Sequence, residues 1–129
     1  MRNRATRLAR DHANRAFKEG GRASLPGWRT DRGRIFAKWG QYDDVLQKIA
    51  ASRAPTYEVW RYTRQKDRYF IFADRTGFGV FQLLHTNDLN EASKPDWREI
   101  LTEDAVTEIG RWLGVNFYPI GGVGELQPN

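Results

Sequence analysis

Apolar and polar residues alternate in the middle of the chain with the two-residue period that is typical of β-strands. In Thr56–Arg64, Tyr57 and Val59 fall on one face, whereas Trp60 and Tyr62 fall on the other. This segment is therefore predicted to form a strand.

Two more predicted strands follow after short loops. The segment Arg68–Ala73 is dense in β-forming aromatic residues, and Phe78–His85 comes after a break at Thr76-Gly77. Three consecutive strands with short loops predict an antiparallel meander. Aromatic side chains lie on both faces of the second strand, so one face is expected to meet the helices. The other face needs a second cover, for which another molecule is a candidate.

A spacing of three and four residues predicts helices on either side of these strands. Asn3–Glu19 is amphipathic, with a mostly alanine apolar face. Thr30–Trp39 is a shorter helix, for which Thr30 or Asp31 serves as N-cap. Thr102–Leu113 begins at a threonine cap and stops before a glycine.

The predicted fold class is α+β: a three-stranded antiparallel meander packed with short helices, an extended N-terminal helix and a C-terminal tail. Gln41–Pro55 lacks a clear period and is interpreted as a connector with a helical turn around Asp43–Ala50. A length of 129 residues supports one hydrophobic core. We divide the chain into a basic amphipathic helical arm at residues 1–22, an α+β domain at 23–114 and an extended apolar tail at 115–129. The tail either folds back or docks on a partner.

The net charge of +5 is concentrated near the N-terminus. Residues 1–38 carry eleven Lys or Arg and three acids, whereas residues 39–129 carry ten and thirteen. Clustered cations suit an anionic partner such as a lipid surface, a nucleic acid or an acidic protein face, and a solvated helix face is the alternative. The predicted contacts to an anionic partner are Arg2, Arg4, Arg7 and Arg10, and the predicted apolar partner anchors are Phe117, Tyr118 and Ile120.

Few residues offer chemistry of their own. The chain has no cysteine and two histidines, so a thiolate metal site is excluded, and no cofactor or metal is expected. His85 with Asp88, and His12 with Asp11, could form acid–base pairs, but each lacks a third member. We therefore predict that the protein is not an enzyme. No apolar stretch is long enough to span a bilayer or to act as a signal peptide, which predicts a cytoplasmic protein, peripheral at the membrane.

The segment Gly27–Phe36 reads Gly-Trp-Arg-Thr-Asp-Arg-Gly-Arg-Ile-Phe and is followed by Trp39-Gly40. Together with Tyr57–Tyr62 and Phe70–Gly79, it resembles the motifs of the GWxTD domain family. That resemblance covers residues 25–85 and implies a bacterial domain without an assigned activity, usually carried on larger exported proteins. The expected framework residues are Gly27, Trp28, Thr30, Asp31, Arg32, Gly33, Arg34, Trp39 and Trp60.

The basic stretch inside this motif allows two interpretations. Arg32 and Arg34 could clamp a phosphate or carboxylate at the start of a helix. Alternatively, Thr30 or Asp31 caps the helix and an arginine pairs with a strand acid such as Glu58. The structural interpretation is favoured, by analogy with how helix caps are usually used.

The preferred functional hypothesis is a non-catalytic, membrane-extrinsic scaffold or linker subunit that bridges components of a larger bacterial, membrane-associated complex. A bioenergetic or photosynthetic complex is an example, and the expected partners are other protein subunits and an anionic lipid surface. A less favoured alternative is a nucleic-acid-binding module that uses the residues Arg15, Lys18, Arg22, Tyr69, Phe72 and Phe81. A third is a small enzyme or ligand-binding protein with a pocket around Trp60, Tyr62 and His85.

Overall fold

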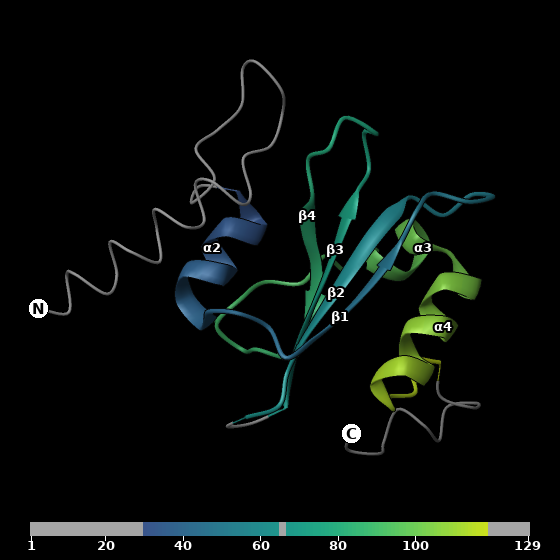
Figure 1. Cartoon of the computed structure of the whole chain (residues 1–129). Coiled ribbons are helices and arrows are strands. Elements are labelled where there is room, and N and C mark those ends of the chain that lie inside the picture. Colours follow the sequence, from purple (N-terminus) through teal and green to yellow (C-terminus); the bar gives the residue numbers. More distant parts are fainter. Residues whose placement is uncertain (1–29, 65–66, 119–129) are drawn as a thin grey trace, which may run out of the picture.

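A computed structural model describes residues 30–64 and 67–118 (Figure 1). The predicted N-terminal helix, the arginines assigned to it, Gly27, Trp28 and Ile120 lie outside the described residues. Within the described part, the α+β class is confirmed.

The sheet contains four strands, not three. They are β1 (Asp44–Lys48), β2 (Thr56–Tyr62), β3 (Arg68–Asp74) and β4 (Gln82–Thr86). Their order in the sheet is β1-β2-β3-β4, and each neighbouring pair is antiparallel. The meander is confirmed, with one more strand than predicted.

Strand β1 corrects the interpretation of residues 41–55 as a connector with a helical turn. Its sequence, Asp-Val-Leu-Gln-Lys, has only two apolar residues, and Asp44, Gln47 and Lys48 are exposed. Val45 packs on one face of the sheet and Leu46 on the other. Pairing with β2 supplies the backbone hydrogen bonds, so the strand forms despite its weak intrinsic preference.

Strand β4 begins four residues later than predicted, at Gln82 instead of Phe78. Residues 75–81 form a loop, and the register between β3 and β4 shifts at Ile71/Phe72. At this bulge Leu84 has no register partner in β3; Leu83 packs in one of the two core clusters and Leu84 in the other.

Helix α2 (Asp31–Trp39) covers one face of the sheet. Ile35 and Phe36 of the helix are buried against the inward side chains of the strands, which include Trp60, Tyr62, Phe70 and Phe72. The helix ends at Gly40, whose φ of 81° is in the region that glycine favours. The predicted helix and its glycine stop are confirmed.

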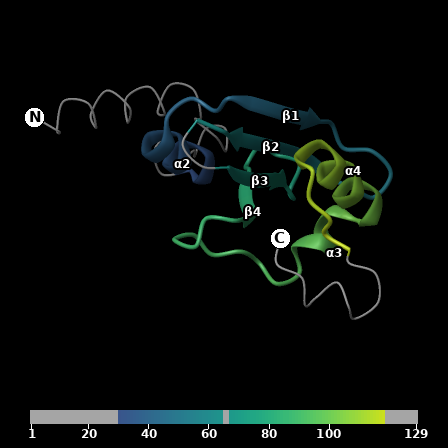
Figure 2. The ribbon, with the colours of Figure 1, turned by 90° about the horizontal axis from the view of Figure 1, so that it is seen from below.

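Helices α3 (Trp97–Leu101) and α4 (Glu103–Leu113) cover the opposite face (Figure 2). Ala105, Val106 and Ile109 of α4 pack against a second cluster that includes Val59 and Ile71. Both faces are therefore covered by the chain itself, and the second cover does not require another molecule.

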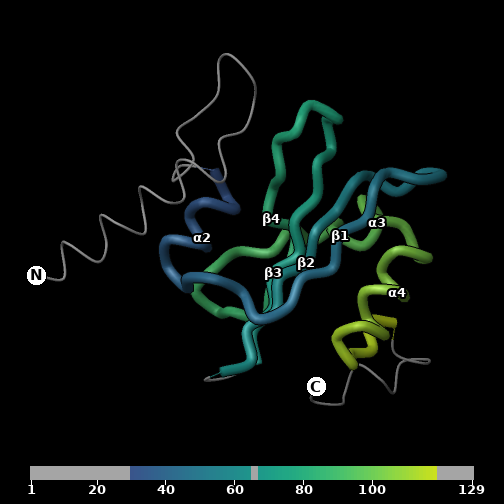
Figure 3. The backbone as a smooth tube through the Cα atoms, viewed as in Figure 1, coloured from purple at the N-terminus to yellow at the C-terminus, as the bar shows by residue number. Residues whose placement is uncertain are grey.

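The loops gather at the two ends of the sheet. Residues 49–55 connect β1 to β2 and residues 75–81 connect β3 to β4, so the antiparallel order places both loops at one end. Figure 3 shows these two loops at the upper end of the tube. We call this end, formed by residues 49–55 and 75–81, the loop end.

Candidate functional site

The start of α2 follows the structural interpretation of the motif. Thr30 Oγ1 accepts a hydrogen bond from the Gly33 N–H at 2.9 Å, which is an N-cap. The carboxylate of Asp31 accepts from the Leu83 N–H at 2.7 Å, so it joins the helix to strand β4. Arg34 donates to Asp31 at 2.8 Å. Capping by Thr30 is confirmed.

Arg32 and Arg34 are both paired with acids of this chain. Arg32 Nη1 donates to Glu58 Oε1 at 3.0 Å, and both side chains are largely buried. The guanidinium of Arg32 also lies 3.9 Å from the ring centre of Phe81. Arg34 donates to Glu91 at 2.7 Å. The predicted pair between an arginine and Glu58 is confirmed, and the arginine is Arg32. The anion-clamp interpretation needed the Arg32 guanidinium for a bound anion, but this group is already paired with Glu58.

The aromatic framework residues lie in the core beneath α2. Trp60 is fully buried and packs against Phe36 and Phe72, and Trp39 packs against Tyr62 and Phe70. These contacts join the helix to β2 and β3 through large apolar surfaces.

This packing contradicts two expectations about exposed aromatic residues. Tyr69 and Phe72 are buried on opposite faces of the sheet, so they cannot form a stacking platform for nucleic-acid bases. Trp60 and Tyr62 face α2, whereas His85 lies on the other side against Trp97. No pocket therefore brings Trp60, Tyr62 and His85 together.

His85 is held by partners that sequence reasoning did not identify. Its Nδ1 lies 2.9 Å from Ser93 Oγ and its Nε2 lies 3.1 Å from the Tyr69 hydroxyl. Its ring stacks on Trp97 with a centre separation of 4.3 Å and an interplanar angle of 2°. Burial, and then the nearby charge of Arg98, lower the pKa of His85 to about 4.

No hydrogen bond joins His85 to Asp88 among the described residues. Asp88 instead accepts a hydrogen bond from the Asn90 N–H in the turn that follows β4. At neutral pH His85 is uncharged, and both of its ring nitrogens are already in hydrogen bonds. The arrangement fits a core histidine better than a general base.

Two of the predicted partner anchors lie within the described residues. Phe117 makes edge contacts with the rings of Tyr69, His85 and Trp97, and its carbonyl accepts from Arg98 at 2.7 Å. The ring of Phe117 is partly buried by these contacts, and its role as a partner anchor stays a prediction. Tyr118 is partly exposed and lies under the Arg98 guanidinium. Residues 115–118 therefore fold back onto the domain.

A different group of residues gathers at the loop end. Asp74, the last residue of β3, accepts hydrogen bonds from the backbone N–H groups of Gly77 at 2.9 Å and Gly79 at 2.8 Å, and from the Thr76 hydroxyl at 3.1 Å. Thr76 Oγ1 in turn accepts from the Phe78 N–H. Burial alone would raise the pKa of Asp74, but these donors lower it below its usual value.

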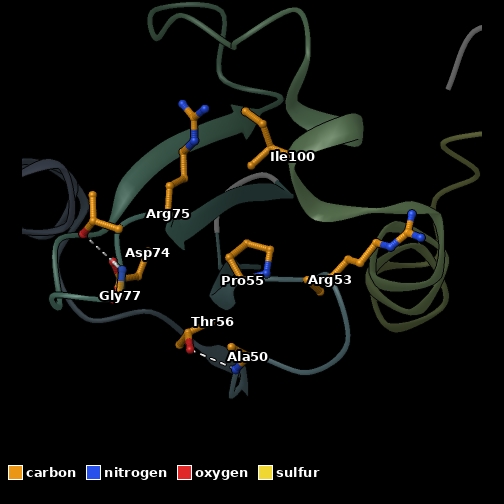
Figure 4. A pocket seen from close by; sticks show the side chains of 10 residues that line it. Ala50, Arg53, Pro55, Thr56, Asp74, Arg75, Gly77 and Ile100 are labelled. Atoms are coloured by element: carbon orange, nitrogen blue, oxygen red, sulfur yellow. Dashed lines mark hydrogen bonds between the residues drawn. The ribbon is translucent and has the colours of Figure 1, made fainter.

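A hollow of about 470 Å³ lies between the two loops. Its lining includes Pro55 and Ile100, and Figure 4 shows Arg53 and Arg75 reaching it from different loops. Within residues 30–64 and 67–118, neither arginine has a hydrogen bond or an ion pair with another residue.

The loop end also exposes large apolar side chains next to this hollow. Phe78 is 80% exposed and Ile49 is 85% exposed. The sequence analysis identified none of Phe78, Ile49, Arg53 and Arg75 as site residues. It placed Phe78 in a strand and Ile49 in a helical turn. The signal that could have located one loop is the pair of glycines around Phe78, which both have positive φ, 82° and 85°.

The described residues contain no group of three or more His, Asp or Glu side chains arranged to hold a metal ion. Among the helices of that part, none is both long and apolar enough to cross a membrane.

Comparisons with known proteins found no match: no family model, no curated protein and no solved structure is similar to this chain at a significant level. The resemblance to the GWxTD domain family therefore remains a prediction from its motifs.

Proposed function

We propose that this chain is a non-catalytic docking module: a membrane-extrinsic scaffold or linker subunit that bridges components of a larger complex. The observation that carries the proposal is the loop end, where Phe78 and Ile49 are exposed beside Arg53 and Arg75. Exposed apolar side chains gathered beside cations are typical of a surface that contacts a partner.

The polar groups near the core support a structural domain over an enzyme. His85 is uncharged and hydrogen-bonded at both nitrogens. Glu58 is paired with Arg32, and Asp31 is bonded to the backbone of β4. Each of these groups has a role in holding helix and sheet together.

The test is site-specific photo-crosslinking in native membranes of the source cells. A photoreactive amino acid is placed at Phe78 or Ile49, and at Leu89 as a control that is 99% exposed in the segment after β4. We expect adducts with lipids or with subunits of one membrane complex from positions 78 and 49, identified by mass spectrometry and absent from position 89. Recovery of the chain without any adduct from all three positions would contradict the proposal.

A further inference from the structure

The loop end presents one large apolar side chain in each of its two loops. Phe78 lies in the loop between β3 and β4, and Ile49 lies directly after β1. Each is at least 80% exposed. The lining of the hollow includes Ala50 and Gly77, the chain neighbours of these two residues. The exposed apolar surface therefore comes from two separate loops next to the hollow.

Three backbone N–H groups at the Phe78 tip are hydrogen-bonded inside the loop. Asp74 accepts from the N–H groups of Gly77 and Gly79, and Thr76 accepts from the N–H of Phe78. A tip that enters an apolar medium must satisfy its backbone donors internally, since unpaired N–H groups are costly there. The three internal bonds lower the cost of moving these N–H groups into an apolar medium.

The charges around the hollow are suited to an anionic surface. Arg53 and Arg75 line it and have no acid partner among the described residues. The acid of the same lining, Asp74, is turned toward the loop amides. The negative surface potential of an anionic bilayer attracts arginine side chains close to it.

A bilayer fits this shape better than a protein does. A stable protein interface buries about 800 Å² on each partner in a continuous, complementary patch. The two side chains need no complementary patch on a fluid bilayer. Each of them inserts independently at the boundary between headgroups and acyl chains.

We infer that the loop end docks on an anionic phospholipid bilayer. Phe78 and Ile49 insert below the headgroups, while Arg53 and Arg75 contact the lipid phosphates. The inference rests on the proposed membrane-extrinsic function and assigns the membrane contact to these loops, separately from the basic residues near the N-terminus.

The first test measures binding of the full chain to vesicles by flotation. Vesicles of phosphatidylcholine are compared with vesicles that contain 30% phosphatidylglycerol. Phe78→Ser is expected to weaken binding to the anionic vesicles about tenfold. Leu89→Ser is the matched control, because it removes an equally exposed apolar side chain outside the loop end and is expected to leave binding unchanged. Combined substitution of Arg53→Gln and Arg75→Gln is expected to reduce the preference for anionic vesicles at least tenfold.

The second test uses the absence of cysteine from the chain. Phe78→Cys and Leu89→Cys each create a unique site for an environment-sensitive fluorophore. On anionic vesicles, the probe at position 78 is expected to shift to shorter wavelength and to be quenched by spin labels on the acyl chains, whereas the probe at position 89 stays in water.

Two results would overturn the inference. One is equal vesicle binding by the wild type and by Phe78→Ser, which would assign all membrane affinity to other parts of the chain. The other is a probe at position 78 that is unaffected by vesicles but shielded by a membrane-protein extract. That second result, together with protein adducts in the crosslinking experiment, would leave the proposed docking function in place with a protein as the partner.

Discussion

Lowering the pH from 7 to 5 is expected to destabilise this protein through His85. Burial of the ring, followed by the charge of Arg98, lowers the pKa of this side chain to about 4, from an ordinary value of 6.5. The folded protein therefore keeps His85 neutral at pH 5, whereas the unfolded chain binds a proton there. Because the unfolded state binds more protons in this range, stability falls as the pH falls.

The size of the effect follows from the two pKa values. At pH 5, a side chain with a pKa of 6.5 is about 97% protonated and one with a pKa of about 4 is about 9% protonated. This difference in proton binding between the folded and unfolded states lowers the free energy of unfolding at pH 5 by about 2 kcal/mol relative to high pH. Solvent that reaches the partly exposed ring reduces this figure, so we expect a loss of about 1–2 kcal/mol.

Carboxylates contribute little to the change in stability between pH 7 and pH 5. The pKa of Asp43 is lowered to about 2, mainly by the Thr63 N–H and then by Arg64. The pKa of Glu108 is also lowered, chiefly by Lys48. The stability that such groups provide is present above their ordinary pKa values and is lost only as the pH falls below about 4.

Urea denaturation at pH 7, 6 and 5, followed by tryptophan fluorescence, measures the loss. With a typical slope of about 1.5 kcal/mol per molar urea, the wild-type midpoint should fall by about 1 M between pH 7 and pH 5. His85→Gln keeps polar atoms near Ser93 and Tyr69 but cannot titrate, so its midpoint should change little over this range. His12→Gln, which removes the other imidazole of the chain, should retain the wild-type dependence.

Two outcomes would refute this reasoning. A wild-type midpoint that stays constant between pH 7 and pH 5 would mean that His85 keeps an ordinary pKa in the folded state. A decrease that persists in His85→Gln would assign the effect to other groups.

Three substitutions test the packing directly by urea denaturation. Gly110→Ala places a Cβ 2.5 Å from the Val115 carbonyl oxygen and should cost about 1–3 kcal/mol; a neutral effect would mean that residues 115–118 do not lie over α4. Arg32→Ala should lower the free energy of unfolding by about 3 kcal/mol, because it leaves Glu58 buried without its cation. Arg32→Met combined with Glu58→Leu should recover most of that loss. Additive losses from the two sites would contradict a coupled pair. Thr30→Ala should cost about 1 kcal/mol, and no loss would show that the cap is unimportant.

Features set by local sequence were predictable. The alternation in β2 placed Tyr57 and Val59 on one face and Trp60 and Tyr62 on the other, as the two clusters confirm. The cap by Thr30 was predictable for a similar reason, because it depends on residues only three positions apart.

Features set by contacts between distant segments were not predictable. Strand β1 depends on pairing with β2, and its own composition gives little sign of it. The expected cap at Thr102 is wrong: its side chain makes no capping bond, and its φ is 83°. The Thr102 N–H donates to the Arg98 carbonyl at the end of α3, and the Thr102 carbonyl accepts from the Val106 N–H at the start of α4. Thr102 therefore connects the two helices through its backbone, and this role depends on how the helices pack together.

The loop end escaped detection for a related reason. Glycines around Phe78 are visible in the sequence, but the sequence does not show that the Asp74 carboxylate holds their N–H groups. That contact ends β3 and delays β4, which converts a predicted strand residue into an exposed loop tip. Arg53 and Arg75 are 22 positions apart, and only the antiparallel order of the strands brings them to one hollow.

The position of the loop end also follows from what the rest of the sheet leaves open. Helices cover both faces, so a partner cannot reach the sheet from above or below. At the β4 edge, the backbone groups that another strand would need are already bonded within the chain. The Leu83 N–H donates to Asp31, the Thr86 N–H donates to Ser93, and the Leu84 carbonyl accepts from the Lys94 N–H. Addition of a strand at this edge would first have to break these bonds. The β1 edge is five residues long and carries exposed polar side chains, features that discourage pairing with another chain. Among the described surfaces, the loop end thus combines exposed apolar side chains with cations that have no partner among the described residues, and for that reason both proposals place the contact there.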